Sequence, residues 1–317
     1  MKILVTGAGG FVGRWLVPAL VAAGHEVLGT RLPGEAPPDF LAASDRARVR
    51  WLPLELSDGV SVRAAVDELP DAVIHLAALA SGAEARRDPG LAWEVNAAGT
   101  ARLADALGQA RLSGAGEPRF LLVSTAEVYG LGQGTRPRTE DDPLLPVSPY
   151  ASSKVGAEVA ALEVARRTGL HVVIARSFPH TGPGQTENYV VPAFARRLAA
   201  ARRIGAAVVK TGNLDPVRDF LDVRDVVRAY LALLERGAPG RAYNIASGQG
   251  RSLGSIFTDL ATLLGVRATP EADPQLLRTA DIPHLVGDAQ RLTTETGWTP
   301  QISFAQTLQD VVNAQAD

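Results

Sequence analysis

Tyr150 and Lys154 have the residue types and the spacing that proton transfer requires. Residues four apart share one face of a helix, so the phenol and the ammonium would lie side by side. Free tyrosine has a pKa of about 10 and is a poor acid or base near neutral pH, whereas a neighbouring ammonium favours the tyrosinate. We therefore expect the pKa of Tyr150 to be lowered, so that it can exchange a proton with a substrate oxygen.

Two further reactive side chains follow the apolar run 120–124, which is typical of a buried strand. The hydroxyl of Thr125 can hold the substrate oxygen, although a threonine here can also simply cap a turn. The carboxylate of Glu127 can serve as a base. We expect Thr125, Glu127, Tyr150 and Lys154 to form the catalytic set.

Glycines near the N-terminus indicate a binding place for a pyrophosphate. The apolar run 3–5 reads as a strand buried on both faces of a parallel sheet, and Gly7, Gly10 and Gly13 follow it at G-x-x-G-x-x-G spacing. A helical pattern comes next, so backbone N–H groups and the positive end of a helix meet at one point. Gly7 allows the tight turn, Gly10 the close approach of a phosphate, and Gly13 the close packing of helix on strand.

A dinucleotide in this place would be contacted by the residues that follow the next strands. Arg31 stands where such folds usually carry an acid for the ribose hydroxyls, and an arginine would attract a ribose phosphate instead. This favours NADP(H) as the cofactor and leaves NAD(H) open. Glu55 and Leu56 are expected near the adenine, and the small Ala77 and Ala78 would let the chain pass close to the cofactor.

A nicotinamide would also act on the central pair. The positive ring of its oxidised form would add to the effect of Lys154 on Tyr150. Lys154 can in addition hydrogen-bond the nicotinamide ribose. Both residues are therefore expected to bind the cofactor as well as to take part in catalysis.

Alternating strands and helices over residues 1–178 predict an α/β fold, a Rossmann-type doubly wound parallel sheet. His75, alone in an apolar run, reads as a satisfied core residue rather than a ligand. The Gly- and Pro-rich segment 132–149 is expected to be an active-site loop, and 34–45 another loop. The expected strands are 3–5, 25–30, 49–56, 71–76, 120–124 and 171–176, and the expected helices are 60–69, 90–112 and 150–167.

The pattern changes after Phe178, where Gly182-Pro183-Gly184 breaks the chain and strands become fewer. We expect residues 1–178 to form the dinucleotide-binding domain and residues 179–317 to form mainly a smaller α+β substrate-binding cap, with segments at about 208–247 returning to the sheet. The elements expected here are helices 189–201, 223–235 and 253–264 and short strands 208–210 and 242–245.

Composition excludes several classes of function. The 317 residues are 46% hydrophobic and 21% charged, which is typical of a globular protein, and the net charge of -2 gives no reason to expect nucleic acid or an anionic membrane as partner. The absence of cysteine excludes disulfides, thiolate catalysis and Cys-ligated metal, and no metal site is expected. No apolar run spans a bilayer and the chain begins directly with a strand, so we expect a cytoplasmic protein.

The chain resembles the extended short-chain dehydrogenase/reductase family, in particular its nucleotide-sugar branch, over nearly its whole length. The resemblance implies a Rossmann domain, an NAD(P) cofactor, a nucleoside-diphosphate-sugar substrate and a homodimer formed through a four-helix bundle of helices 90–112 and 150–167. It also adds Phe11, Val12, Leu76, Ser124 and Phe178 to the expected cofactor-binding residues. The motifs that carry it are 7–13, 75–78, 124–130, 150–154 and 176–178.

Segments further along are similar to the GDP-mannose branch and to its GDP-4-keto-6-deoxy-mannose reductases, namely 180–185, 211–220, 286–288 and 296–300. This resemblance implies that Arg218 pairs with the substrate pyrophosphate as a bidentate donor, with Arg278 as a second phosphate contact. The alternative for Arg218 is a salt bridge to a neighbouring aspartate, Asp219 or Asp222. The other expected substrate-binding residues are Thr125, Glu127, His180 and Asn188. Many relatives have Asn where Pro179 stands, so no role is carried over there.

These residues together predict reduction of the 4-keto group of a GDP-4-keto-6-deoxy-hexose to a GDP-6-deoxyhexose of the GDP-rhamnose type. Hydride would come from the nicotinamide and the proton from Tyr150. One alternative is a GDP-mannose 4,6-dehydratase or a nucleotide-sugar epimerase, for which Glu127 remains but Ala126 replaces the acid of the thymidine-sugar dehydratases. A different class of alternative is a non-catalytic NADP(H)-sensing scaffold.

Overall fold

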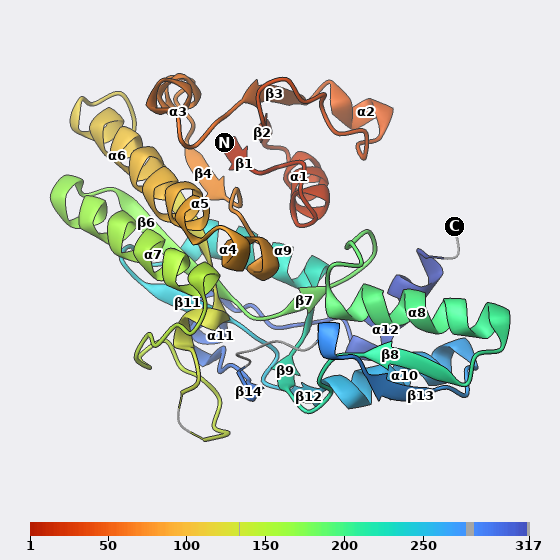
Figure 1. Ribbon diagram of the computed structural model, residues 1–317. Coiled ribbons are helices and arrows are strands. Elements are labelled where there is room, and N and C mark those ends of the chain that lie inside the picture. The colour runs from red at the N-terminus through yellow and green to blue at the C-terminus, as the bar shows by residue number, and fades with distance from the viewer. Residues whose placement is uncertain (133, 277–281, 316–317) are drawn as a thin grey trace.

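The computed structural model describes residues 1–132, 134–276 and 282–315. Its main sheet has seven parallel strands in the order β11-β6-β5-β4-β1-β2-β3 (Figure 1). The order runs outward in both directions from the β1–β4 pair, as in a doubly wound dinucleotide fold, so the predicted fold class is confirmed. The strands are β1 (Lys2–Thr6), β2 (Glu26–Arg31), β3 (Val49–Pro53), β4 (Ala72–His75), β5 (Arg119–Thr125), β6 (His171–Ser177) and β11 (Ala242–Ile245).

The central strands are apolar on both faces because helices cover both faces of the sheet. Ile3, Leu4 and Val5 are fully buried, and Leu4 lies between Leu28 of β2 and Val73 of β4. Such continuous apolar runs can be satisfied only in the middle of a three-layer arrangement.

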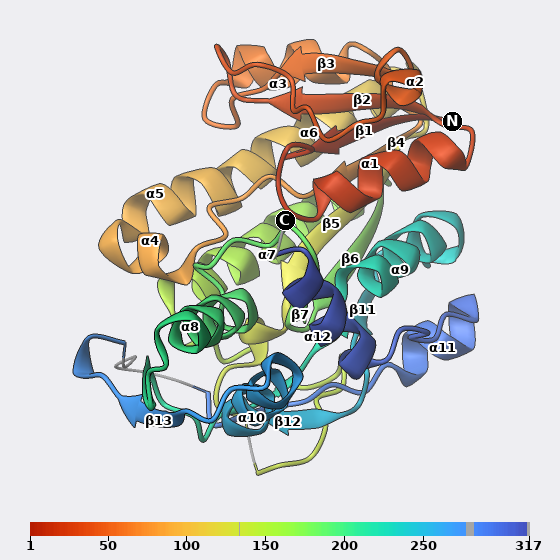
Figure 2. The same ribbon diagram turned by 90° about the vertical axis from the view of Figure 1, so that its right-hand side faces the viewer.

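Two groups of helices form the outer layers (Figures 1 and 2). On one face lie α3 (Gly59–Val66), α6 (Gly99–Leu112) and α7 (Pro149–Thr168), whose apolar residues form one hydrophobic cluster with the sheet. On the other face lie α1 (Gly13–Ala22), α9 (Val223–Arg236) and α11 (Gln290–Thr296), which belong to a second cluster. Helix α7 is fixed at both ends by Ser148, whose hydroxyl accepts from the Ala151 amide at 3.1 Å, and by Gly169, which has a φ of +77°.

The long helix predicted for 90–112 is built from three consecutive pieces, α5 (Pro89–Trp93), a π-helical turn η1 (Glu94–Ala98) and α6. The wider turn accommodates the buried Asn96, whose side chain bonds to Leu79 and Ser153 instead of facing solvent. Two short helices lie outside the prediction, α2 (Ala43–Arg46) within the expected loop 34–45 and α4 (Gly82–Arg87) after β4.

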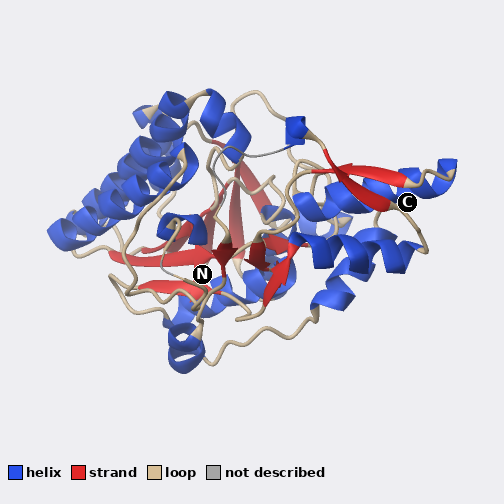
Figure 3. Ribbon diagram, turned by 60° about the horizontal axis from the view of Figure 1, so that its bottom comes forward, coloured by secondary structure: helices blue, strands red, loops and turns tan. Residues whose placement is uncertain are grey.

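The C-terminal part has a hydrophobic cluster of its own, formed mainly by α8 (Val190–Ile204), α10 (Leu253–Leu264) and α12 (Phe304–Asn313). Figure 3 shows these helices grouped with short strands, apart from the helices of the main sheet. The remaining short elements are η2 (Ala126–Tyr129), β7 (His180–Thr181), β8 (Val208–Thr211), β9 (Val217–Asp219), β10 (Leu221–Asp222), β12 (Gly250–Ser252), β13 (Thr269–Ala272), η3 (Pro274–Leu276) and β14 (His284–Leu285).

The segment 208–247 divides between the two parts. Its later portion, α9 and β11, packs on and extends the main sheet, whereas β8 pairs with β13 and β9 pairs with β12 and β14. A division into a dinucleotide-binding domain over 1–178 and a cap over 179–317 remains our proposal.

The described residues of the segment 132–149, which the sequence suggested as an active-site loop, lie outside the cleft described below. Its buried Arg138 exchanges backbone hydrogen bonds with the distant chain, from Arg138 N to the Val286 oxygen and from Asp288 N to the Arg138 oxygen, both at 2.8 Å. The Asn244 side chain also donates to the Arg138 carbonyl at 2.8 Å. These bonds hold the segment against residues 286–288, and none of its described residues lines the cleft described below.

No helix within the described ranges is long and apolar enough to cross a membrane.

Gly13 and Gly59 both begin a helix, yet only Gly13 is closely packed. A Cβ atom on Gly13 would lie 2.1 Å from the Ala8 carbonyl oxygen, whereas one on Gly59 would meet nothing within 4 Å. We expect Gly13→Ala to lower the free energy of unfolding by about 1–3 kcal/mol, because backbone must move to admit the methyl group. The control Gly59→Ala should leave it unchanged or raise it by up to about 1 kcal/mol. Urea unfolding followed by circular dichroism measures both, and equal effects would contradict the close packing of helix α1 on its turn.

Candidate cofactor and substrate cleft

A cleft of about 1070 Å³ opens where the carboxyl ends of the central strands meet helix α8. Residues at or just after the ends of β1, β4, β5 and β6 line it, among them Gly7, Leu76, Thr125 and Phe178. This is the crevice at the reversal of strand order in which doubly wound folds bind their ligands.

The glycine turn closes one end of the cleft without room for side chains. Gly7 has a φ of +65°, and a Cβ atom there would lie 2.8 Å from the backbone of Ala77. The Gly10 amide donates to the Gly7 oxygen at 3.0 Å, which makes the turn tight, and α1 begins immediately afterwards at Gly13. The bare turn and the helix N-terminus together fit a bound pyrophosphate.

Arg31 supplies a cation at the neighbouring end of the cleft. One terminal N–H group of its guanidinium bonds to the Glu35 carbonyl, while its Nε is buried with no hydrogen-bond partner among the described residues. Glu55 holds the adjacent turn, because its Oε1 accepts from the Ser57 amide at 3.1 Å and hydroxyl at 2.9 Å. An unpaired buried guanidinium N–H is what a ribose phosphate would bind, so the residues present fit a phosphorylated dinucleotide.

The turn after β4 is oriented by a chain of hydrogen bonds through His75. The Ala77 amide donates to Thr6 Oγ1 at 3.1 Å, Thr6 Oγ1 bonds to His75 Nδ1 at 2.7 Å, and His75 Nε2 bonds to Thr100 Oγ1 at 3.1 Å. The Thr100 hydroxyl donates to the Asn96 carbonyl at 2.6 Å, so the imidazole must donate through Nε2 and accept at Nδ1. Burial lowers the pKa of His75 to about 3, which keeps it neutral. The interpretation of His75 as a satisfied core residue therefore agrees with its contacts.

Asn96 links this turn to the helix that carries the catalytic pair. Its Oδ1 accepts from the Leu79 amide at 2.7 Å, and its Nδ2 donates to Ser153 Oγ at 2.9 Å. Ser153 directly precedes Lys154 on α7. The hydrogen bonds of Asn96 therefore connect the turn after β4, which lines the cleft, to the helix that carries Lys154.

The expected catalytic residues meet at the middle of the cleft. Thr125 ends β5, and its hydroxyl caps the turn η2 by accepting from the Glu127 amide at 3.2 Å. Thr125 and Tyr150 both line the middle of the cleft, and Lys154 Nζ donates to the Val123 carbonyl at 2.8 Å. All four expected residues, Thr125, Glu127, Tyr150 and Lys154, line the same cleft.

The expected lowering of the Tyr150 pKa is wrong for this structure. Burial raises the pKa of the phenol well above its ordinary value, the Glu127 carboxylate adds to the increase, and the neighbouring Thr125 hydroxyl opposes it. Lys154 is itself buried, and burial lowers its pKa to about 8 although the Glu158 carboxylate raises it. The sequence argument considered only the positive charges of the ammonium and of an oxidised nicotinamide, and could not include the desolvation of both groups.

The residues expected on the substrate side come from strands and loops of the C-terminal part. His180 stacks on Phe11 with ring centroids 6.3 Å apart and an angle of 10° between the planes, and its Nδ1 donates to the Phe178 carbonyl at 3.0 Å. Asn188 is exposed at the edge of the cleft, and Arg218 of β9 lines it. Arg278 lies outside the described residues.

The two aspartates beside Arg218 have other partners. Asp219 is fully buried and accepts from the amides of Ser247 at 3.0 Å and Gly248 at 2.8 Å. Asp222 pairs with Arg224 at 2.7 Å. These bonds fix the strand from which Arg218 reaches the cleft.

Every described residue that the sequence analysis expected at the cofactor or substrate lines this cleft, and the role of each residue remains a prediction. The cleft also contains residues that the sequence gave no means of placing there, because they come from the turn after β4, from α8 and α9 and from the loop near β8. These are Leu79, Ala80, Tyr189, Arg197, Asn213 and Tyr230. The available signals were that Tyr189 follows the expected Asn188 and that Asn213 lies within the segment 211–220. The described residues contain no cluster of His, Asp and Glu that could hold a metal ion.

A doubly wound parallel sheet with a tyrosine and a lysine at the carboxyl edge of its strands is the architecture of a nicotinamide-dependent oxidoreductase of the short-chain dehydrogenase/reductase type. The family model described as GDP-mannose 4,6 dehydratase matches residues 4–311, and the chain belongs to this family.

Known proteins similar to the chain include reductases and epimerases of nucleotide sugars. GDP-6-deoxy-D-mannose reductase of Pseudomonas aeruginosa is 35% identical over 314 residues, which cover 98% of this chain and 96% of that protein. The structure of RMD from Pseudomonas aeruginosa complexed with NADPH is 33% identical, with a TM-score of 0.82 over 99% of this chain and 98% of that one. The UDP-glucose 4-epimerase of Thermotoga maritima with UDP-glucose is 27% identical, with a TM-score of 0.88 over 100% and 99% of the two chains.

Proposed function

We propose that this enzyme reduces the 4-keto group of a GDP-4-keto-6-deoxy-hexose to give a GDP-6-deoxyhexose of the GDP-rhamnose type. The observation that carries the proposal is that Thr125, Tyr150 and Lys154 line one cleft together with the bare glycine turn. The similarity to the GDP-6-deoxy-D-mannose reductase of Pseudomonas aeruginosa supports the choice of substrate. A cytoplasmic location is part of the same proposal.

The raised pKa of Tyr150 suits a proton donor. A phenol that stays protonated near neutral pH can give its proton to the ketone oxygen, and the neighbouring Thr125 hydroxyl can hold that same oxygen. The nicotinamide, when bound, supplies the hydride for the ketone carbon. Lys154, fixed by the Val123 carbonyl, offers a positive charge that favours the tyrosinate left behind.

We expect Tyr150→Phe to lower kcat for NADPH oxidation with GDP-4-keto-6-deoxy-mannose by about 10²–10⁴-fold, because the proton donor is lost. The dissociation constant for NADPH, from quenching of protein fluorescence, should change by less than about threefold. The matched control Tyr189→Phe removes another phenol hydroxyl that lines the cleft and should keep most of the activity. A Tyr150→Phe enzyme with full activity would contradict the mechanism and favour a cofactor-sensing scaffold.

A 4,6-dehydratase is the second candidate, because Glu127 lies close enough to Tyr150 to affect its pKa and could remove the proton from carbon 5. The neighbouring position is Ala126, which is fully buried and offers no acid for the departing hydroxyl at carbon 6. Incubation of the wild-type enzyme with GDP-mannose and no added reduced cofactor separates the two functions. Formation of a keto sugar under these conditions would favour the dehydratase.

We propose NADPH rather than NADH as the preferred cofactor, on the basis of the buried unpaired Nε of Arg31. A hydrogen bond to a charged group contributes about 1.5–3 kcal/mol. Arg31→Gln should therefore raise KM for NADPH by about ten- to a hundredfold and leave KM for NADH within about twofold, as measured by steady-state kinetics. Arg50→Gln, on the next strand and paired with Glu68, is the control and should change neither. Equal changes for both cofactors in Arg31→Gln would show that Arg31 does not contact a ribose phosphate.

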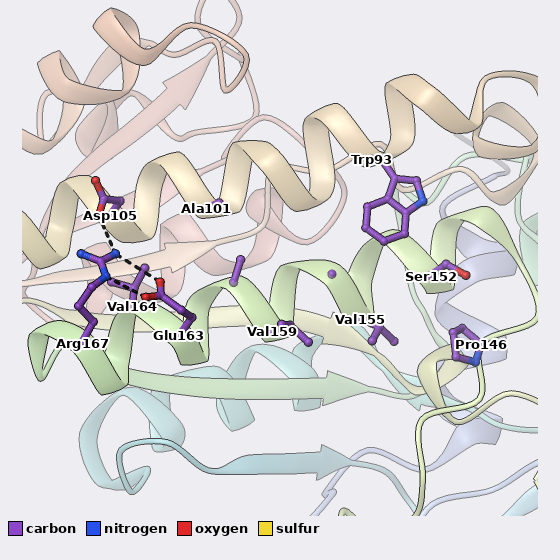
Figure 4. A pocket seen from close by; sticks show the side chains of 12 residues that line it. Trp93, Ala101, Asp105, Pro146, Ser152, Val155, Val159, Glu163, Val164 and Arg167 are labelled. Carbon is purple, nitrogen blue, oxygen red and sulfur yellow. Dashed lines mark hydrogen bonds and ion pairs between the residues drawn. The ribbon is translucent and has the colours of Figure 1, made fainter.

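We further propose that the enzyme is a homodimer joined through helices α6 and α7. Between these helices lies an open groove whose walls are largely apolar (Figure 4). Trp93 and Val159 line it with exposed fractions of 47% and 62%. They lie together with Val155 and Ala160, and a contiguous apolar patch of this kind marks a protein interaction site. Arg167 pairs with Asp105 and Glu163 at one end of the groove, so the apolar part has a charged rim.

The dimer predicts that Val159→Glu weakens association, because two copies of a carboxylate would be buried at the centre of the interface. Sedimentation velocity should show the wild type at twice the chain mass and the variant mainly at the single-chain mass. Ile204→Glu, at an 80% exposed position at the end of α8, is the control and should leave the dimer intact. A wild-type protein that sediments as a single chain would contradict the proposed dimer.

A further inference from the structure

A buried ion pair lies one helical turn beyond the catalytic pair and has no part in the mechanism above. Glu158 on α7 and Arg176 on β6 have side-chain exposed fractions of 2% and 8%. Glu158 Oε2 accepts from Arg176 Nη2 at 2.8 Å, and Glu158 Oε1 accepts from Arg176 Nε at 3.1 Å. Because the desolvation of two charges offsets much of their attraction, a buried pair of this kind is a poor explanation of stability alone.

The carboxylate of Glu158 on α7 also contacts the end of strand β5, next to the catalytic residues. Its Oε1 accepts from the Ser124 hydroxyl at 2.5 Å, and Ser124 lines the cleft immediately before Thr125. Lys154 precedes Glu158 by four residues, so the two side chains share one face of α7. Glu158 and Lys154, one turn apart on α7, therefore both contact the end of β5, through Ser124 and the Val123 carbonyl respectively.

Arg176 pairs with this carboxylate and is itself held by groups on other elements. Its Nη1 donates to the Tyr129 hydroxyl and to the Glu140 carbonyl, both at 3.1 Å. The Tyr129 hydroxyl donates in turn to Asn244 Oδ1 at 2.6 Å. The guanidinium is thus bound on both sides and does not lose its proton, so the position and the counter-charge of Glu158 are fixed.

We propose that Glu158 is a positioning residue for the reduction: its carboxylate, held by Arg176 and Ser124, keeps Lys154 an ammonium directed at the end of β5. The inference rests on the proposed function and extends it, because it names the residue that keeps Lys154 of that site positively charged. Without this carboxylate, Lys154 would be a buried amine whose neutral form is favoured by desolvation. A neutral Lys154 would no longer favour the tyrosinate that proton donation leaves on Tyr150.

The other groups around Lys154 cannot take over this task. On α7 itself the neighbour is the uncharged phenol of Tyr150, and the facing group on β5 is the Val123 carbonyl. On β4 the neighbour is His75, which is neutral because its pKa lies at about 3. Glu158 is the one side chain of the described residues whose charge raises the pKa of Lys154, against the burial that lowers it to about 8.

The test is a pH titration of Lys154 by NMR on the full chain, which needs neither substrate nor cofactor. Besides Lys154 the sequence contains only Lys2 and Lys210, so protein labelled with ¹³C at lysine Cε gives a spectrum that Lys2→Arg and Lys210→Arg assign. The wild-type Lys154 resonance should titrate with a midpoint near 8. In Glu158→Gln, which keeps the size and an acceptor for Ser124, the midpoint should fall by about one to three pH units.

Two further variants keep the outcome interpretable. Glu117→Gln, a surface glutamate beside Arg111, should leave the midpoint where it is. If Glu158→Gln is poorly folded because Arg176 is left unpaired, the double variant Glu158→Gln/Arg176→Met removes both charges. Its midpoint should also be lowered, but by less than in Glu158→Gln, because the loss of the guanidinium acts in the opposite direction. A folded Glu158→Gln or double variant whose Lys154 midpoint equals that of the wild type would overturn the inference.

The pH profile of the reaction gives a second readout that depends on the proposed function. With GDP-4-keto-6-deoxy-mannose and NADPH, the alkaline limb of kcat/KM should move to lower pH in Glu158→Gln by the same interval as the NMR midpoint. A residue that only stabilised the fold would lower kcat without moving the limb. If the NMR midpoint moves but no substrate is reduced, the proposed function fails and the assignment of Glu158 stands.

Discussion

The hydrogen bond from Lys154 Nζ to the Val123 carbonyl, 2.8 Å long, joins the catalytic helix to the end of the central strand β5. Together with the bond from Ser124 to Glu158, this contact holds α7 against β5, so that Tyr150 and Thr125 line the same cleft. An ammonium that is almost fully buried costs free energy unless other groups compensate it. Much of the surrounding polar structure, from Glu158 to Arg176, serves to keep that cation in place.

The site depends equally on the residues at the carboxyl ends of the parallel strands, which meet at one edge of the sheet. The ends of β1, β4, β5 and β6 supply a bare glycine turn, a turn of small residues, a hydroxyl and an apolar wall. Two of these ends are tied to distant elements: the turn after β4 through His75 and Asn96, and the end of β6 through the contacts of Arg176. The substrate side of the cleft comes instead from the separate cluster around α8.

Much of this could be predicted from the sequence, and the rest follows from contacts between distant segments. Local patterns predicted the apolar run 3–5, the glycines after it and the capped helix over 150–167. Such patterns depend on residues close together in the sequence, so they can be recognised without the tertiary structure. The π-helical turn at Asn96 could not be foreseen, because it depends on Leu79 and Ser153, which lie far away in the chain. The place of the segment 132–149 depends on bonds from Arg138 to 286–288, and the raised pKa of Tyr150 depends on burial by groups from several elements.

The central claim is that this cleft carries out a reduction in which the sugar carbon receives hydride from the cofactor. The most direct measurement uses NADPH deuterated at nicotinamide C4 on the transferred face, together with GDP-4-keto-6-deoxy-mannose, and locates the label in the sugar by NMR and mass spectrometry. The account predicts one deuterium at carbon 4 of the hexose for each NADPH consumed. Label that stays in the cofactor, or appears at another carbon of the sugar, would contradict it.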